Sequence, residues 1–475
     1  MNFEMTVGLE THFELSTKSK IFCSCPNCFG GEANTKCCPV CLGLPGSLPV
    51  LNREVVEYAV KAGLALNCRV EEYSYMARKN YIYPDLPKAY QITQGDRPIC
   101  HSGQLNLSDG SVIRINRLHI EEDAGKLIHK DGVTFADYNR CGVPLVEIVT
   151  EPDFNSAEQV REYLEKLRLI MKTLGVSDCR MQEGSMRCDV NLSVKKREDK
   201  KPGEKIEIKN VNSFSFIAKA INYEYKRQCS LLERGERITA QTRRFNEATG
   251  ETESMRDKEE GEDYRYFPEP DIPAVYISHE EIEKIKKTLP ELPDAKYERY
   301  IEEYNLTADE AVQIIKYPAA VDYFERLIKL SGNAKLSAKL LVSNIFACVR
   351  EELKRENGNF PNAEYIAEVV MLIERGKLKG GAVKTATQKI TAENKPFKEL
   401  FNITDFAGMS DEETAALADK AIAENQTAVR DYLAGKDRAI FAVVGKVMKE
   451  SKGRADAEKV LEYVKKAINE VLKGK

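Results

Sequence analysis

The sequence lacks the short motifs with which many enzymes hold a nucleotide or activate a nucleophile. It contains no G-x-x-x-x-G-K-[ST] loop, and no G-x-G-x-x-G follows a predicted strand. It has no G-x-S-x-G sequence, and its five histidines show no spacing that supports nucleophilic catalysis. These absences argue against a self-contained hydrolase or glutaminase. A bound nucleotide would have to be held by metal ions and cationic side chains.

Long apolar runs and a strong net charge are also absent. No segment approaches the ~18 apolar residues of a membrane span, and the N-terminal MNFEMTVGLETHFEL mixes charges with its apolar residues, unlike a signal peptide. We therefore expect a cytoplasmic protein with no membrane partner, whose cysteines are thiols or thiolates. The net charge of -4 gives no general affinity for nucleic acid. An RNA contact would need a local basic surface, such as the stretch 446–475, where Lys and Arg outnumber Asp and Glu.

The 475 residues divide into a strand-rich part followed by helical parts. Residues 1–290 are predicted to form an α+β domain with a mainly antiparallel sheet, because short runs of alternating apolar and polar residues dominate them. One strong helix, 156–174, is predicted inside this domain, with a capping box at its start and Gly175 at its end. Residues 291–395 are predicted to form an all-α helical domain, and residues 396–475 a small helical tail domain.

The clearest predicted strand lies at the start of the chain and carries candidate site residues on its polar face. Apolar and polar residues alternate along residues 3–15, which places Glu10 and His12 on one face, about 7 Å apart at ~3.4 Å per residue. Such a pair is most often an ordinary solvated face, but other predicted strands also carry acidic groups. Several strands that present carboxylates to one side would form an oxygen-rich site suited to Mg²⁺. The further polar residues are Glu121, Glu122, Asp123, Glu147, Glu151, Asp189 and Asn191.

The sequence also contains lysines and arginines that could bind phosphate in a phosphoryl-transfer site. Each of them alone would be read as a surface or structural charge. Together with the carboxylates they outline a site in which catalysis depends on positioning and charge neutralisation. They are Arg78, Lys79, Lys88, Arg140, Arg243, Arg244 and Arg265.

Six of the thirteen cysteines lie within residues 22–43, FCSCPNCFGGEANTKCCPVCLG. Four thiolates from this loop would form a closed, tetrahedral zinc site of the structural kind. Free buried cysteines or a redox C-x-x-C pair are the alternative interpretations, but so dense a cluster in one Gly- and Pro-rich loop favours zinc. The inferred ligands are Cys23, Cys25, Cys38 and Cys41, with Cys28 and Cys37 as spares.

A set of longer motifs extends along the whole chain. They are VGLETH, CPVCLGLPGSLPVLN, RKNYIYPDLPKAYQI, RLHIEEDAGK, DYNRCGVPLVEIVTEPD, EGSMRCDVNLSV, IKNVNSF and DYRYFPEPDIP. Together they resemble the B subunits of the bacterial glutamyl/aspartyl-tRNA amidotransferases, and N-R-x-G-x-P-L-x-E-I, residues 139–148, is highly specific to that family. No aspartyl-tRNA-synthetase-like insert precedes the helices, which favours the bacterial type over its archaeal relative.

The resemblance implies a first domain with a cradle fold similar to the catalytic domain of glutamine synthetase. It implies that ATP and Mg²⁺ are used to phosphorylate the side-chain carboxylate of Glu or Asp mischarged on tRNA(Gln) or tRNA(Asn). Ammonia would then displace the phosphate. The ammonia would come through a tunnel from an amidase partner, the A subunit, in a complex that also contains a small C subunit. The helical tail would hold the outer corner of the tRNA.

The resemblance also implies roles for single residues. The metal-binding positions of the family correspond to Glu10, His12, Glu122 and Glu147, which would hold Mg²⁺ and act in catalysis, and its zinc cysteines correspond to Cys23, Cys25, Cys38 and Cys41. Because some members lack these cysteines, the zinc would be structural. Substrate or tunnel-mouth contacts are expected from Lys79, a catalytic candidate, and from Lys88, Glu121 and Asp123, and contacts to the nucleotide and its metal from Asp189, Asn191 and Arg265.

Two other functions remain open on the residues alone. A zinc-stabilised RNA-binding protein without catalysis would need only the cysteine cluster and the basic tail, but it has no use for several acidic side chains in one pocket. A free-standing carboxylate–amine ligase would leave the long helical tail unexplained.

Overall fold

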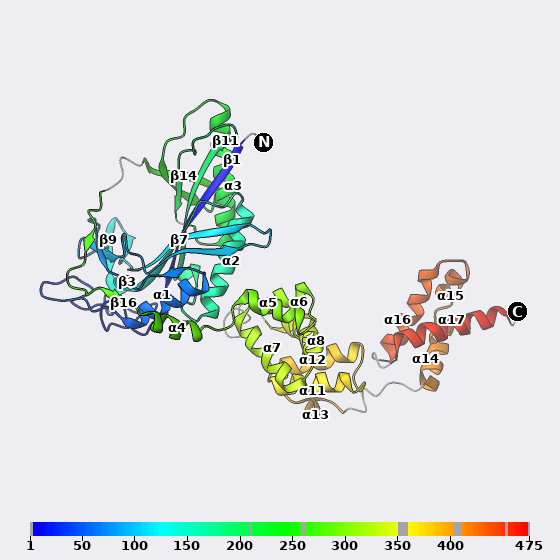
Figure 1. Cartoon of the computed structure of the whole chain (residues 1–475). Helices are drawn as coiled ribbons and strands as arrows, with labels where there is room; N and C mark the ends of the chain where they lie inside the picture. Colours follow the sequence, from blue (N-terminus) through cyan, green and yellow to red (C-terminus); the bar gives the residue numbers. More distant parts are fainter. Residues whose placement is uncertain are drawn as a thin grey trace. The chain divides into compact units, whose positions relative to one another are not determined.

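The computed structural model describes residues 3–209, 211–257, 263–349, 360–402, 411–451 and 455–473. The chain forms two compact units, Met1–Pro293 and Asp294–Lys475 (Figure 1). The first unit contains the strands, whereas the described residues of the second are helices and their connections. The α+β prediction is therefore confirmed: a large sheet domain is followed by helices.

A nine-stranded sheet forms the centre of the first unit, in the order β14-β13-β12-β11-β1-β10-β7-β6-β2. Neighbouring strands are antiparallel except β12 and β13, which run parallel and make the sheet mixed. The strand at the middle of the sheet is β1, which corresponds to the strand predicted along residues 3–15. The strands are β1 (Phe3–Glu14), β2 (Arg69–Val70), β6 (Cys100–Asn106), β7 (Val112–Glu122), β10 (Pro144–Thr150), β11 (Met186–Lys196), β12 (Ile206–Lys209), β13 (Gln241–Asn246) and β14 (Glu251–Asp257).

Three helices cover one face of this sheet: α1 (Arg53–Ala65), α2 (Ala157–Thr173) and α3 (Phe214–Glu233). Helix α3 contacts β11, β14 and α2, and α1 contacts β6 and β7 (Figure 1). The apolar side chains of the strands, among them Leu9 and Phe13 of β1 and Val146 and Ile148 of β10, are buried in the core shared with these helices. Because side chains alternate along a strand, the polar residues between them lie on the opposite face.

Smaller elements lie around the main sheet. A three-stranded sheet has the order β15-β4-β5, and two separate strand pairs join β3 to β16 and β8 to β9. Their bounds are β3 (Tyr73–Ser74), β4 (Ala77–Asn80), β5 (Tyr90–Thr93), β8 (Lys126–Lys130), β9 (Val133–Asp137), β15 (Phe267–Pro268) and β16 (Val275–Tyr276); helix α4 spans His279–Lys287.

The helix boundaries follow local capping chemistry. The Ser156 side chain accepts a hydrogen bond from the backbone N–H of Gln159 at the start of α2, where the sequence predicts a cap. Gly175 follows the end of this helix with a φ of 68°, a conformation that favours glycine over any residue with a Cβ. The predicted helix 156–174 is confirmed.

The regular elements in the described part of the second unit are all helices. Helices α14 to α17 share a hydrophobic core of their own, which includes Ala418, Val443, Val460 and Val464. The helices are α5 (Pro293–Glu302), α6 (Ala308–Ile315), α7 (Pro318–Ser331), α8 (Ala334–Leu340), α9 (Phe346–Cys348), α11 (Ala363–Glu374), α12 (Gly381–Glu393), α13 (Phe397–Leu400), α14 (Asp411–Glu424), α15 (Gln426–Leu433), α16 (Ile440–Glu450) and α17 (Ala457–Lys473).

Among the described residues, no helix combines the length and the apolar character that crossing a membrane requires.

Candidate functional site

A cavity of about 760 Å³ lies on the sheet face that α1, α2 and α3 leave uncovered. Its floor is formed by polar residues of the central strands, including Glu10 and His12 of β1 and Glu147 of β10. Its rim comes from the three-stranded sheet, through residues such as Lys79 and Phe267. The alternation that buries Leu9 and Phe13 against the helices therefore presents the intervening polar side chains to this cavity.

The strand register brings histidines and carboxylates together on the cavity floor. His12 lies opposite Glu147 in the β1–β10 pair, and Glu147 lies opposite His119 in the β10–β7 pair. His12 Nε2 is 3.5 Å from both Glu121 Oε1 and Glu147 Oε2, and His119 Nε2 is 3.1 Å from Glu147 Oε2. We call His12, Glu121 and Glu147 the first acidic cluster; its ligand atoms lie within 4.8 Å of one another.

The groups of this cluster influence one another's protonation. Burial lowers the pKa of His119, but hydrogen bonds and charge from Glu121 and Glu147 outweigh it and raise the pKa to about 9. Burial raises the pKa of Glu147, but the hydrogen bonds from His119 and His12 hold it well below its usual value. Glu147 is thus an ionised carboxylate, the state that a cation ligand requires.

A second acidic cluster, Glu10, Asp189 and Glu207, lies beside the first, with ligand atoms again within 4.8 Å of one another. Glu10 faces Asp189 across the β1–β11 pair. Lys209 Nζ bridges Asp189 and Glu207 at 3.1 Å each, and Asn191 Nδ2 donates a hydrogen bond of 2.8 Å to Glu10. Glu207 and Lys209 were not among the residues predicted from the sequence. The apolar residues Ile206 and Ile208 that flank Glu207 are the signal for a strand with its polar face on this side.

Glu122, which the family pattern assigns to the metal site, is not among the residues that line the cavity. Strand β7 alternates, so His119 and Glu121 face the cavity and Glu122 faces the other side. There Glu122 is buried, pairs with Lys88 and accepts a hydrogen bond of 2.8 Å from the backbone N–H of Ile92. Glu121, and not Glu122, therefore lies on the cavity side of β7.

The predicted cations are divided between the cavity and the surrounding structure. Lys79 lines the cavity, with its ammonium 4.6 Å from the ring centroid of Tyr264, whereas Arg265 is not a lining residue. Arg187, which was not predicted, does line it and donates a hydrogen bond of 2.9 Å to Asp123. The other predicted cations are paired with carboxylates: Arg78 with Glu269, Lys88 with Glu122, Arg140 with Asp123, Arg243 with Glu224 and Arg244 with Glu253.

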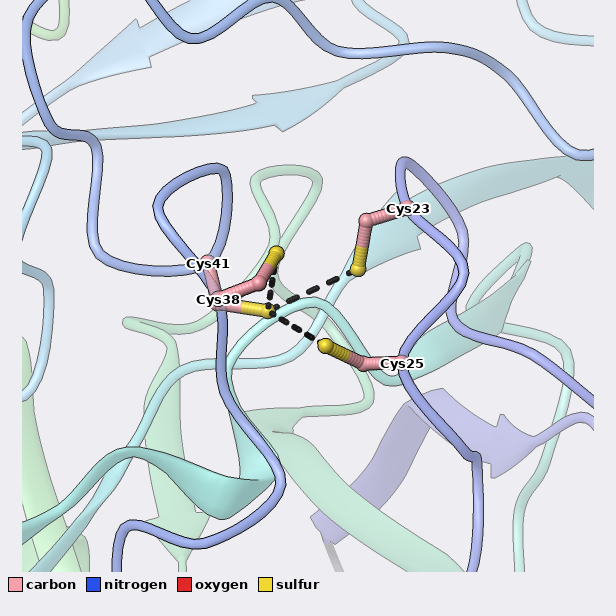
Figure 2. Close-up of side chains that lie close together, drawn as sticks. All are labelled: Cys23, Cys25, Cys38 and Cys41. Carbon is pink, nitrogen blue, oxygen red and sulfur yellow. Dashed lines mark hydrogen bonds between the residues drawn. The ribbon is translucent and has the colours of Figure 1, made fainter.

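The predicted cysteine site is compact (Figure 2). The Sγ atom of Cys41 lies 3.6 Å from that of Cys23, 3.8 Å from that of Cys38 and 4.0 Å from that of Cys25. These separations are too long for disulfides, and they match the ~3.8 Å between sulfurs that surround one zinc ion tetrahedrally at ~2.3 Å. A hydrogen bond from Cys23, together with the nearby Lys20, lowers the pKa of the Cys41 thiol to about 4. Cys28 and Cys37 lie outside this group of four.

A fully buried lysine joins the cysteine loop to the wall of the cavity. Lys20 Nζ lies 3.5 Å from Cys41 Sγ and donates a hydrogen bond of 2.7 Å to the carbonyl oxygen of Cys141. The backbone N–H of Gly142, the next residue, donates to the carbonyl oxygen of Asp123 at 3.1 Å. Asp123 lines the cavity, so the cysteine site and the cavity share a continuous set of contacts.

The comparisons with known proteins agree over nearly the whole chain. Residues 5–283 match the family model described as GatB/GatE catalytic domain, and residues 322–468 match the one described as GatB domain. Three similar proteins are each named as the B subunit of an aspartyl/glutamyl-tRNA(Asn/Gln) amidotransferase. That of Carboxydothermus hydrogenoformans is 46% identical over 100% of this chain and 98% of its own length. The protein of Caldicellulosiruptor saccharolyticus is 46% identical over 99% of this chain and 100% of its own length. The protein of Persephonella marina is 45% identical over the full length of both chains. The chain therefore belongs to the family of B subunits of the aspartyl/glutamyl-tRNA(Asn/Gln) amidotransferases.

Proposed function

We propose that this chain converts Glu carried on tRNA(Gln), Asp carried on tRNA(Asn), or both, to the corresponding amide with ATP and ammonia. The observation that carries the proposal is a pair of acidic clusters that present His12, Glu121, Glu147, Glu10 and Asp189 to one cavity, in a chain of this family. A side-chain carboxylate is a poor acceptor for ammonia because its oxygen is a poor leaving group. When a carboxylate oxygen attacks the γ-phosphorus of ATP, ADP is released and the oxygen becomes part of an acyl phosphate. Ammonia can then attack the carbonyl carbon and displace the phosphate.

The two clusters suit the divalent cations that such a reaction requires. Carboxylate oxygens are the preferred protein ligands of Mg²⁺, and the ligand atoms of each cluster lie within 4.8 Å of one another. Bound Mg²⁺ would neutralise charge on the phosphates during transfer. Lys79, Arg187 and Lys209 also line the cavity and can offset the charge of transferred phosphate. Our proposed metal residues are Glu10, His12, Glu121 and Glu147, with Asp189 and Asn191 at the neighbouring position.

The source of ammonia is proposed to be a partner. The relatives are named as B subunits, which implies other subunits, and we propose an amidase as the A subunit and a small protein as the C subunit. The sequence offers no nucleophile motif with which it could release ammonia from glutamine itself.

We also propose the finer organisation that the family resemblance implies. The first unit would be a glutamine-synthetase-like cradle, and the helical part would divide near residue 395 into a middle domain and a tail that holds tRNA. The separate core of α14 to α17 supports the independence of that tail.

A zinc ion is proposed for the four-cysteine site, with a structural role, and Lys20 offers a test. Lys20→Met removes the buried ammonium beside Cys41, and zinc affinity is expected to fall about 10- to 100-fold, as for other outer-shell groups. Competition with a chromogenic chelator measures this. Lys18→Met, at an exposed site two residues earlier, is the matched control and should bind zinc as the wild type does. Equal zinc affinity in the two variants would contradict a role for Lys20.

The proposed function is tested by reconstitution. The chain is combined with its amidase and small partners, mischarged tRNA, ATP and glutamine, and amide formation on the tRNA is measured. Ammonium chloride should replace glutamine even when the amidase is inactivated, because amidation itself is assigned to this chain. No amide formation from either nitrogen source would reject the proposal.

A further inference from the structure

A second hollow adjoins the cavity at one edge. Its volume is about 370 Å³, and it shares Gly95, Asp96 and Arg117 with the larger cavity. Its remaining lining includes Arg97, in the loop after β5, and Asn116 of β7. We call this hollow the annex. Its position gives it direct access to whatever occupies the cavity.

A β-bulge shapes the wall of the annex. In the β10–β7 pair Val149 lies opposite Arg117, whereas Thr150 lies opposite Ile115, so Asn116 is an extra residue on β7. A bulge leaves one residue unpaired and re-aims the side chains beside it. Asn116 and Arg117 accordingly both line the annex, although adjacent residues of a regular strand would face opposite sides.

The annex is lined by two arginines and two carboxylates, and its arginines are not paired with those carboxylates. Its two carboxylates are engaged: His101 Nε2 lies 2.6 Å from Glu71 Oε1, and the Tyr75 hydroxyl donates a hydrogen bond of 2.6 Å to Asp96. Within the described part of the chain, neither Arg97 nor Arg117 forms an ion pair or a side-chain hydrogen bond. Arg114, on the same strand, is instead paired with Asp153 at 2.6 Å.

Two unpaired guanidinium groups on one hollow suit a phosphate, because their planar forks match its oxygens. The cavity beside them is lined by carboxylates and suits metal-bound phosphates of a nucleotide. The annex instead contains Arg97 and Arg117, which have no ion-pair partner among the described residues, so it suits a phosphate that has no bound metal ion. The amino acid substrate is attached to the 3′ end of an RNA chain, whose backbone must continue from the cavity toward solvent.

We propose that Arg97 and Arg117 bind a backbone phosphate near the 3′ end of the tRNA whose aminoacyl group occupies the cavity. This inference rests on the proposed function and adds the residues that hold the RNA end. The contact is electrostatic and independent of base identity, so it serves tRNA(Gln) and tRNA(Asn) equally.

The test uses Arg97→Gln, Arg117→Gln and the double variant in the complete heterotrimeric complex. The KM for aminoacyl-tRNA should rise about tenfold for each substitution, with kcat and the KM for ATP unchanged. The salt dependence of tRNA affinity should become shallower by about one unit of slope per lost phosphate contact. Arg114→Gln is the matched control on the same strand and should leave all these quantities as in the wild type.

Direct binding of uncharged tRNA separates failure of this inference from failure of the proposed function. Removing the 3′-terminal nucleotides of the tRNA should weaken binding to the wild-type complex but not to the double variant, whether or not amidation occurs. An unchanged affinity and salt slope in the arginine variants would overturn the inference. So would a rise in the KM for ATP alone, because it would assign the annex to the nucleotide.

Discussion

Replacing Glu147 by Gln in the heterotrimeric complex is expected to lower the rate of tRNA amidation by at least ~100-fold. Glu147 lies between His12 and His119 on the cavity floor, and its pKa is held low. Glutamine keeps the size of the side chain but removes the anionic oxygen that the proposed metal site needs. The rate is measured as amide formed on the tRNA under single-turnover conditions, over a range of Mg²⁺ concentrations.

The control for this variant is Glu158→Gln, an exposed position in the first turn of α2. It changes the same chemical group on a helix that covers the other face of the sheet, so it should leave the rate unchanged. Thermal unfolding of each complex shows whether the variants are folded. A folded Glu147→Gln complex with wild-type amidation at all Mg²⁺ concentrations would contradict the metal assignment.

Removing the four-helix tail is expected to lower kcat/KM for full-length tRNA by about 100-fold, because one of two linked contacts with the RNA is lost. The truncation ends at Asn402, before α14, and the removed helices share a core of their own. The KM for ATP should be unchanged, because the acidic clusters lie in the first unit.

An RNA minihelix that contains only the acceptor stem provides the matched substrate. It lacks the outer corner of tRNA, so full-length and truncated complexes should use it equally well. Wild-type kcat/KM of the truncated complex on full-length tRNA would contradict a tRNA-binding tail and favour a free-standing ligase. If the truncation lowered kcat/KM equally on tRNA and on the minihelix, the tail would instead contribute to the stability of the complex.

Strand alternation explains how much of the site the sequence could predict. In β1 the apolar residues Leu9 and Phe13 flank Glu10 and His12, so their common face could be read directly. In RLHIEEDAGK the apolar Leu118 and Ile120 alternate with His119 and Glu121, so local alternation favours Glu121 for the polar face, whereas the family pattern pointed to Glu122. Which residues surround Glu121 could not be read locally, because the strand register depends on pairing with β10, which follows β7 in the chain only after β8 and β9.

Other features depend on contacts between distant parts of the chain. The alternation of Ile206, Glu207 and Ile208 indicates a strand, but the position of Glu207 beside Glu10 and Asp189 results from the order of strands in the sheet. The bulge at Asn116 exists only relative to β10. The contact of Lys20 with Cys41 needs the folded loop. A local sequence pattern does not indicate such contacts, because they join residues that are distant in the chain.

ATP cleavage without an amide donor shows whether this chain phosphorylates the carboxylate of an aminoacyl-tRNA. The complex is supplied with ATP, Mg²⁺ and either mischarged or uncharged tRNA, with glutamine and ammonium omitted, and ADP is measured. We expect ADP formation that requires the mischarged tRNA and is lost in Glu147→Gln. ATP cleavage that is equal with uncharged tRNA, or absent with mischarged tRNA, would contradict the claim.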